Sequence, residues 1–351
     1  MEFLAEYGLF LAKAVTIVVA IGVVLGLAMG LQRNKQASEK GHLEVIRLNE
    51  QVHHMSDALK LATLDESVKK LEEKKIRKEE KEKAKAKKKS AQKNDKEEKG
   101  KVFVLNFKGD MRASAVNHLR EEVTAVLSQA SSNDEVVVRL ESAGGMVHSY
   151  GLASSQLDRI RKRQIPLTVC VDKVAASGGY MMACVADKVL SAPFAILGSI
   201  GVIAQMPNFN KVLKKHDVDY ELLTAGEYKR TLTMFGENTD KGREKFIEDL
   251  EETHSLFKQF VAEHRPQVDI SEVATGEIWL GTRAKEVGLV DDLQTSDEYL
   301  VSRMDEAEVF EVNYVHKKKI YEKLGIAAEE RADSLLVRWF DRLVHNPNRM
   351  M

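Results

Sequence analysis

Residues 167–186 read LTVCVDKVAASGGYMMACVA, and this stretch decides the fold class of the chain. Its first five residues are an apolar run of strand length, and the residues from Met181 onward are small and apolar, as in a buried helix. Ser177 lies at the junction, where its hydroxyl is placed at a helix N-terminus and the glycines behind it allow a second backbone to approach closely. Nucleophilic serines are commonly presented in this way, although a Ser-Gly-Gly sequence is more often an N-cap or a turn.

Strands and helices alternate on both sides of this stretch. Upstream, the pattern predicts strands at 102–107 and 135–140 and helices at about 113–130 and 149–161. Downstream, it predicts strands at 188–191, 196–204 and 220–223 and helices at 209–216 and 240–264. Continuous apolar strands that alternate with helices are typical of an α/β domain with a mainly parallel sheet, which we place at 101–300.

Three further segments flank this domain. Residues 14–31 are uncharged and mostly apolar, so we predict that 1–31 is a retained membrane anchor that contacts the lipid bilayer through residues 8–31. The alternative, a cleaved signal peptide, fits less well because acidic residues precede the apolar core and that core is long. We predict a charged tether, helical or disordered, at 32–100 and a C-terminal extension with an amphipathic helix at 301–351.

Composition excludes several classes of function. The formal net charge of the 351-residue chain is −1, which gives no reason to expect a nucleic-acid partner. The two cysteines, Cys170 and Cys184, lie in apolar stretches and are interpreted as small core residues. Neither a CxxC pair nor an HExxH helix is present, so we expect no metal site and no cofactor.

A serine hydroxyl needs a base to become a nucleophile, and the histidines of the domain do not lie in sequences that suggest an active-site turn. Lys229 is the alternative base, because burial and neighbouring positive charge lower the pKa of a lysine. It follows a Gly-marked turn in the sequence AGEYKR, where Tyr228 would shield it from water and Arg230 would add like charge. From spacing alone, a lysine on the surface of a polar turn is the simpler interpretation.

Several short motifs follow one another in a fixed order. They are SAGG at 142–145, AASGGY at 175–180, AD at 186–187, GSIGV at 198–202, GEYKR at 226–230 and AKEVGLVD at 284–291. With this ordered set, the chain from about 101 to 293 resembles the signal-peptide peptidase A group of membrane-bound bacterial serine proteases. Its N-terminal anchor and charged tether are also similar to those of that group. One motif is weak evidence, whereas the ordered set is specific.

The resemblance implies a role for each of five residues. Ser177 is the implied nucleophile and Lys229, 52 residues later, is the implied general base of a Ser–Lys dyad within one protomer. Ser199 is implied to hydrogen-bond the lysine amine and orient it. The backbone amides of Gly144 and Gly178 are implied to form the oxyanion hole.

The resemblance also implies the fold of the Clp protease and crotonase superfamily, with repeated ββα units, and assembly into a homo-oligomeric ring or dome. The implied function is a membrane-bound serine endopeptidase that cleaves peptides or membrane-derived protein fragments through an acyl-enzyme. Proline is frequent in the family where this chain has Ala143, but a backbone donor does not depend on that side chain. Two other functions stay open: a crotonase-like acyl-CoA enzyme and a non-enzymatic oligomeric membrane scaffold.

The charges beside the predicted anchor and the family resemblance imply opposite sides of the membrane for the catalytic domain. Basic residues at 33, 35, 40 and 47 follow the predicted anchor, while Glu2 and Glu6 precede it. The positive-inside rule therefore places the domain in the cytoplasm. The resemblance instead implies a bacterial inner-membrane protein whose catalytic domain faces the periplasm, and we take this as our expectation.

Overall fold

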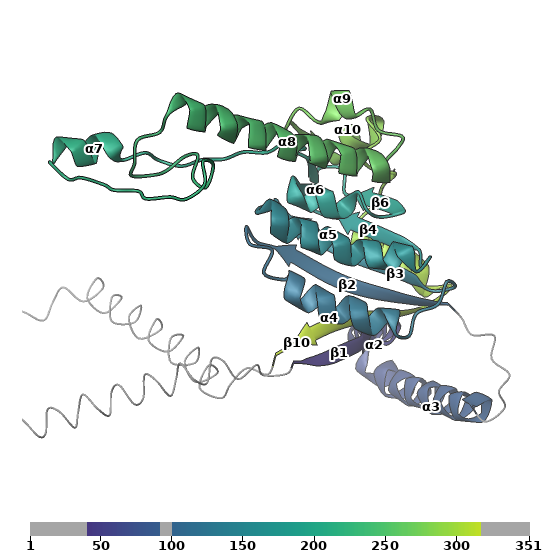
Figure 1. Cartoon of the computed structure of the whole chain (residues 1–351). Helices are drawn as coiled ribbons and strands as arrows, with labels where there is room; N and C mark the ends of the chain where they lie inside the picture. The colour runs from purple at the N-terminus through teal and green to yellow at the C-terminus, as the bar shows by residue number, and fades with distance from the viewer. Residues whose placement is uncertain (1–40, 92–99, 317–351) are drawn as a thin grey trace, which may run out of the picture. The chain divides into compact units, whose positions relative to one another are not determined.

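The computed structural model describes residues 41–91 and 100–316, and a ten-stranded sheet runs through this part of the chain (Figure 1). The strands are β1 (His42–Arg47), β2 (Lys101–Gly109), β3 (Glu135–Ser142), β4 (Leu167–Val171), β5 (Val174–Ala176), β6 (Lys188–Ser191), β7 (Ile196–Gly198), β8 (Ile278–Leu280), β9 (Asp292–Leu293) and β10 (Glu308–Val315). The helices are α2 (Leu48–Ala62), α3 (Glu66–Ala91), α4 (Val116–Leu127), α5 (Val147–Lys162), α6 (Gly178–Ala183), α7 (Asn210–Lys215), α8 (Asp240–His264), α9 (Ile270–Val273), α10 (Gly281–Glu286) and α11 (Ser296–Met304).

The sheet has a main path and a branch. The main path runs β1-β10-β2-β3-β4-β6-β9, and its pairs from β10 to β9 are parallel. The branch begins where β3 ends, because Ser142 of β3 pairs with Ala175 of β5. From there β5 pairs in parallel with β7, and β7 pairs in antiparallel fashion with β8. The branch therefore carries the Ser177 junction at the carboxyl end of the sheet.

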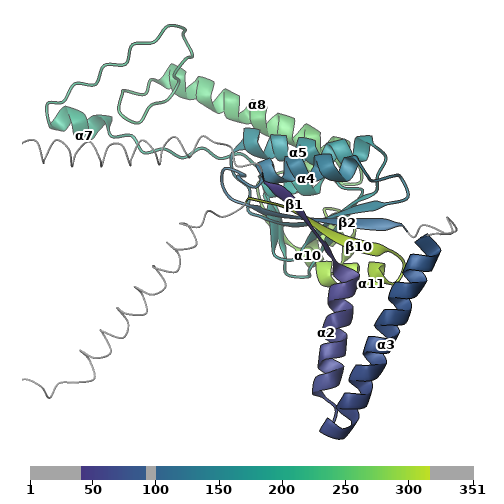
Figure 2. The ribbon, with the colours of Figure 1, turned by 90° about the horizontal axis from the view of Figure 1, so that it is seen from below.

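Side chains of β3 alternate between two apolar cores, as a strand buried on both faces requires. Val136 and Val138 pack in the larger core with residues of α4 and α5, whereas Val137 packs in a second core with Leu300 of α11. Figure 2 shows α4 and α5 on one side of β2 and α11 on the other. The sheet is thus the middle layer of an α/β domain, and this fold class is confirmed.

The elements nearest Ser177 agree with the sequence predictions. The strand predicted at 167–171 is β4, and those predicted at 102–107 and 135–140 lie within β2 and β3. The order β4-β5-α6 has two strands before the helix, as a ββα unit does, whereas one strand precedes each of α4 and α5. Cys170 and Cys184 are buried and free, and burial raises the pKa of each thiol to about 12, so both are inert core residues.

Two predicted strands differ from the structure. The strand predicted at 196–204 ends at Gly198, because Gly198 and Ser199 have φ values of 85° and 51° that leave the extended region. The prediction of a strand at 220–223 is wrong, because this segment is irregular and Leu223 is 91% exposed. A strand requires a neighbour for its backbone hydrogen bonds, and no described strand runs beside this segment.

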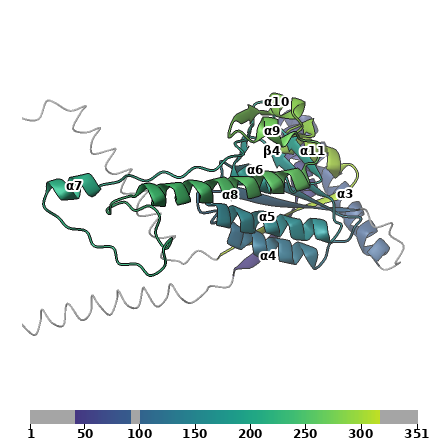
Figure 3. The ribbon, with the colours of Figure 1, turned by 45° about the horizontal axis from the view of Figure 1, so that its top comes forward.

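Residues 202–239 form an arm that leaves the sheet after β7 and ends where α8 begins. α7 lies on this arm, away from the sheet, and the arm is seen beyond the N-terminal half of α8 in Figures 1 and 3. Many of its apolar side chains are exposed, among them Ile203, Val212 and Tyr228. The arm is therefore built with little core of its own.

Residues 48–91 form a helical hairpin. α2 and α3 run side by side (Figure 2), and the Lys60 ammonium lies 2.5 Å from the Glu72 carboxylate across the pair. The tether was predicted to be helical or disordered, and its residues 66–91 are helical. Residues 42–47 of the same predicted tether instead form the strand β1. β1 and β10 extend the sheet beyond residues 101–300.

Several predictions fall outside the described residues. These are the membrane anchor at 1–31, most of the C-terminal extension with its amphipathic helix, and the end of the tether at 92–99. Among the helices formed by residues 41–91 and 100–316, none combines the length and the apolar character that a membrane span requires.

Candidate active site

Ser177 lies in a strained turn between β5 and α6. Its φ of 51° and ψ of −120° are unusual for a residue with a side chain, and such strain is typical of functional sites. The Ser177 backbone N–H donates to the Gly198 carbonyl at 2.8 Å, which holds the turn against β7. The side chain is partly exposed, and its hydroxyl bonds to none of the described residues. The hydroxyl is therefore available to a ligand.

Gly144 and Gly178 lie directly beside Ser177. Gly144 has a φ of 90°, and a Cβ added to it would lie 2.7 Å from the Gly178 nitrogen and 2.8 Å from the Ser177 Cβ. No described residue accepts the Gly178 N–H, which is the first amide of α6. The Gly144 N–H donates to the Ser142 hydroxyl at 3.1 Å. The two amides predicted for the oxyanion hole are thus brought together, and that of Gly178 points to no acceptor in the described part of the chain.

A chain of hydrogen bonds supports this turn from beneath. The Tyr150 hydroxyl donates to the Asp110 carbonyl at 2.7 Å and lies 2.6 Å from the Ser142 hydroxyl, which in turn accepts from Gly144. Tyr150 is fully buried, and burial raises the pKa of its phenol, so it remains a neutral donor. The sequence analysis did not identify Tyr150 as a site residue. Its only sequence signal is that an aromatic residue lies in the first turn of the helix that follows Gly144 and Gly145.

Ser199 emerges next to Ser177. Ala176 of β5 is paired with Gly198 of β7, so the residues that follow them leave neighbouring parallel strands at the same level, about 5 Å apart. The Ser199 N–H donates to the Glu277 carbonyl at 2.6 Å, and its hydroxyl bonds to none of the described residues. The predicted pairing of Ser177 and Ser199 in one site therefore agrees with the backbone register.

A narrow hollow with a volume of about 10 Å³ opens beside Ser177. Its lining is mostly apolar and comes from the Gly144 turn, α5, α6, the start of the arm and α8: Gly145, Val147, Ser177, Gly178, Met181, Gly201, Val202, Thr253 and Phe257. The role of α8 in this wall was not foreseen. Thr253 and Phe257 are four residues apart, so they lie on one face of the helix.

Lys229 is the predicted site residue that the structure does not bring to Ser177. It lies on the arm with its side chain exposed, so the prediction of a buried lysine is wrong for the single chain. The ring of the adjacent Tyr228 lies 6.0 Å from the ammonium groups of Lys241 and Lys245, at the start of α8. Thr253, beside Ser177, is eight residues past Lys245, which is about 12 Å along a helix. Lys229 thus lies near the N-terminal end of α8, whereas Ser177 lies near Thr253, further along the helix.

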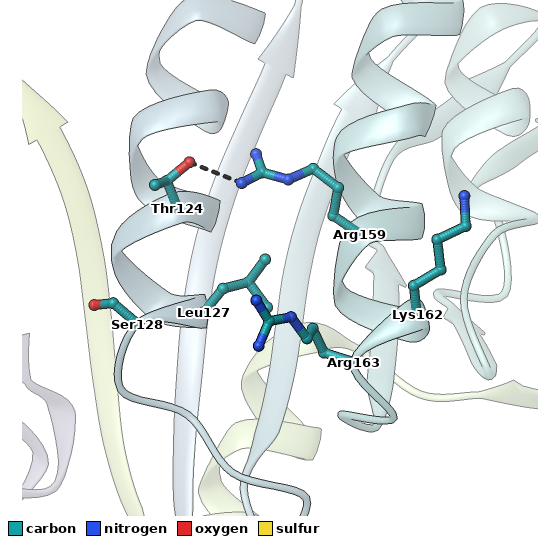
Figure 4. A pocket seen from close by; sticks show the side chains of 6 residues that line it. All are labelled: Thr124, Leu127, Ser128, Arg159, Lys162 and Arg163. Atoms are coloured by element: carbon teal, nitrogen blue, oxygen red, sulfur yellow. Dashed lines mark hydrogen bonds between the residues drawn. The ribbon is translucent and has the colours of Figure 1, made fainter.

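A second hollow, of about 410 Å³, lies between the C-terminal ends of α4 and α5 (Figure 4). Arg159, Lys162 and Arg163 face it, and Arg159 donates to the Thr124 hydroxyl at 3.0 Å. Val147 and Lys162 are the two ends of α5, about 22 Å apart, so this hollow is distant from Ser177. Basic side chains in a last helical turn stabilise the helix dipole, which accounts for their position here.

Comparison with known proteins identifies the family to which the chain belongs. The family models "Peptidase family S49 N-terminal" and "Peptidase family S49" match residues 2–157 and 159–310, and the chain is a member of peptidase family S49. Among its relatives, "Probable protease SohB" of Haemophilus influenzae is 50% identical over 96% of this chain and 96% of the relative. "Probable protease SohB" of Buchnera aphidicola subsp. Acyrthosiphon pisum is 47% identical over 97% of this chain and 98% of the relative.

Proposed function

We propose that the chain is a serine endopeptidase in which Ser177 forms an acyl-enzyme and Lys229 is the general base. The observation that carries the proposal is the strained turn of Ser177 beside the Gly178 N–H and an apolar hollow, where neither the hydroxyl nor this N–H bonds to a described residue. Membership of a peptidase family supports hydrolysis of peptide bonds as the reaction.

In the proposed mechanism, the Lys229 amine takes the proton of the Ser177 hydroxyl as its oxygen bonds to the substrate carbonyl carbon. The Gly178 and Gly144 N–H groups stabilise the oxyanion, and the Gly144 N–H exchanges its bond to Ser142 for one to the oxyanion. The Lys229 ammonium then protonates the leaving amine as the C–N bond breaks. Water, deprotonated by the same amine, attacks the acyl-enzyme and releases the acid and Ser177.

We propose further that Lys229 acts on the Ser177 of another copy of the chain. The arm presents Lys229 about 12 Å or more along α8 from its own Ser177, far beyond hydrogen-bond reach. The exposed apolar side chains of the arm are suited to contact with another subunit. In such a homo-oligomer Ser199, beside Ser177, is placed to orient the incoming amine. This replaces the dyad within one protomer that the resemblance implied.

The hollow beside Ser177 favours a small apolar side chain of the substrate next to the cleaved bond. Its lining by Val147, Val202 and Phe257 supports an apolar side chain, and its volume of only about 10 Å³ supports a small one. An extended peptide that adds beside the Gly144 segment fits this geometry. Peptides and membrane-derived protein fragments are the substrate class that we propose.

The cellular setting is part of the proposal. We propose a single-pass anchor at residues 8–31 in the bacterial inner membrane, with the catalytic domain in the periplasm. The parallel sheet and the β4-β5-α6 order support a Clp protease/crotonase-like domain. A reporter fused after Met351 and active in only one compartment tests the orientation.

The experiment that tests the proposed function is covalent labelling of the full-length protein with a fluorophosphonate, followed by mass spectrometry. We expect the label on the Ser177 hydroxyl, and we expect Ser177→Ala and Lys229→Ala to lose both labelling and peptide hydrolysis. Lys215→Ala, which removes another exposed lysine of the arm, is the matched control and should retain both. Folded wild-type protein that takes no label would favour the scaffold, and peptide hydrolysis that survives in both variants would exclude the dyad.

A further inference from the structure

Three consecutive residues beside the nucleophile are each hydrogen-bonded to a different element. The Gly198 carbonyl accepts from Ser177 at 2.8 Å, the Ser199 N–H donates to the Glu277 carbonyl at 2.6 Å, and the Ile200 carbonyl lies 3.1 Å from Nε2 of His254. The turn 198–200 is thus held by the nucleophile turn, by the segment that leads into β8, and by α8.

The turn needs this support because its backbone is strained. Gly198 and Ser199 have φ values of 85° and 51°, and the second is costly for a residue with a side chain. Strained backbone persists only where the surroundings over-determine it. Each of the three attachments therefore contributes to the position of Ser199 and of the Gly198 carbonyl that orients Ser177.

The attachment to α8 depends on one side chain. Among the described residues, His254 makes the only hydrogen bond between α8 and the turn 198–200. α8 is fixed at this level, because Phe257 and Val261 on the same stretch are buried in the core. Thr253, the neighbour of His254, lines the hollow together with Gly201 and Val202, which follow the turn. A shift of the turn would therefore change the hollow as well.

The hydrogen-bond partner of His254 also indicates which ring nitrogen carries a proton. A carbonyl oxygen can only accept a hydrogen bond, so Nε2 is the donor to Ile200. That nitrogen is unable to take the Ser177 proton at the same time. Nε2 of the ring consequently serves as a hydrogen-bond donor to the turn.

We propose that His254 is a positioning residue for the nucleophile: its hydrogen bond to the Ile200 carbonyl holds the turn 198–200 in the strained form that aligns Ser199 and Ser177. The inference rests on the proposed role of Ser177. It assigns a function to a residue that neither the motifs nor the dyad uses. The α8 helix, whose other end lies beside the Lys229 segment, thereby becomes part of the active-site wall.

The test uses the full-length protein and five variants, and it measures the rate of Ser177 acylation by a fluorophosphonate together with kcat and KM for a peptide. Glutamine reaches as far as Nε2 of histidine and keeps a donor there, whereas asparagine is too short. We expect His254→Asn and His254→Leu to slow acylation and lower kcat by about 10- to 100-fold, since small misplacements at a reacting centre have effects of this size. We expect His254→Gln to stay within about threefold of wild type in kcat.

His264 provides the matched control. Its Nδ1 lies 2.8 Å from the Phe260 carbonyl on the same helix, away from the turn, so His264→Asn should leave acylation unchanged. Equal rates for His254→Asn and wild type, or equal losses for the Gln and Asn variants, would overturn the inference. The comparison of His254→Gln with His254→Asn remains informative if His254→Leu fails to fold. Persistent labelling of Ser177→Ala would instead refute the proposed function, which separates the two failures.

Discussion

Ala176 and Gly198 are paired in parallel register, and the Ser177 N–H that follows the first donates to the carbonyl of the second at 2.8 Å. This relationship brings two serines that are 22 positions apart in the sequence to the same level of the sheet. The carboxyl ends of parallel strands are where α/β proteins build their sites. The branch β3-β5-β7 is therefore the scaffold of the site.

Gly144→Ala should abolish acylation of Ser177. The substitution places a Cβ 2.7 Å from the Gly178 nitrogen and 2.8 Å from the Ser177 Cβ, at a φ of 90°. We expect a loss of at least about 100-fold in kcat, as is typical when an oxyanion donor is displaced. Fluorophosphonate labelling and peptide hydrolysis measure it.

Gly276→Ala is the control for this backbone effect. Gly276 has a φ of 88°, but a Cβ there meets nothing within 4 Å. Backbone strain should cost each variant about 1–2 kcal/mol of unfolding free energy, and the close contacts of Gly144→Ala should add to its loss. Only Gly144→Ala should lose acylation. An active Gly144→Ala protein would contradict the assigned oxyanion hole.

Tyr150→Phe should lower both stability and kcat. It removes the hydroxyl that bonds to the Asp110 carbonyl and to Ser142 beneath Gly144. We expect a loss of about 1–3 kcal/mol in unfolding free energy, since the buried Ser142 hydroxyl loses the acceptor for its proton, and about a tenfold loss in kcat. Chemical denaturation and peptide hydrolysis measure the two effects.

Tyr180→Phe is the matched deletion of a buried hydroxyl. The Tyr180 hydroxyl donates to the Leu289 carbonyl at 2.9 Å and has no link to Ser142 or Gly144. It should lose stability to a similar degree and keep its kcat. Parallel losses of kcat in both tyrosine variants would mean that Tyr150 has only a structural role.

Glu122→Gln should remove a pH dependence of stability. Glu122 is 5% exposed and accepts the Tyr314 N–H at 2.8 Å, and burial raises the pKa of its carboxyl. A raised pKa in the folded state means that the stabilisation is complete below the ordinary carboxyl pKa and is lost as the pH rises through the folded pKa. Glutamine keeps the acceptor without the charge.

We therefore expect Glu122→Gln to unfold at a higher temperature than wild type at pH 7.5 and to show a smaller difference at pH 4. Calorimetry at the two pH values measures this, and Glu121→Gln, an exposed neighbour on α4, should leave both temperatures unchanged. A Glu122→Gln protein that is less stable at pH 7.5 would show that the carboxylate is stabilising.

The sequence was sufficient to predict those parts of the fold that depend on the local pattern of apolar residues. Apolar strands such as 167–171 and the junction at Ser177 are local features, and the structure contains them where the pattern predicted. The proximity of Ser199 to Ser177 required the register of β5 and β7, which the ordered motifs indicated only through the resemblance.

The remaining features depend on long-range contacts. His254 and Thr253 join the site because α8 packs across it, and a helix pattern alone does not reveal its neighbours. The strand predicted at 220–223 had a suitable apolar pattern but no partner strand. The exposure of Lys229 follows from an arm that packs on little of its own domain, which no local pattern encodes.

The central claim is that Ser177 and Lys229 act together across two copies of the chain, and co-expression of two inactive variants tests it most directly. Ser177→Ala and Lys229→Ala each lack one half of every site, but a mixed oligomer joins an intact serine to an intact lysine from its neighbour. Random mixing of equal amounts predicts about a quarter of wild-type peptide hydrolysis, with the label on Ser177 of the Lys229→Ala copy. Mixed oligomers as inactive as either variant alone would contradict the account.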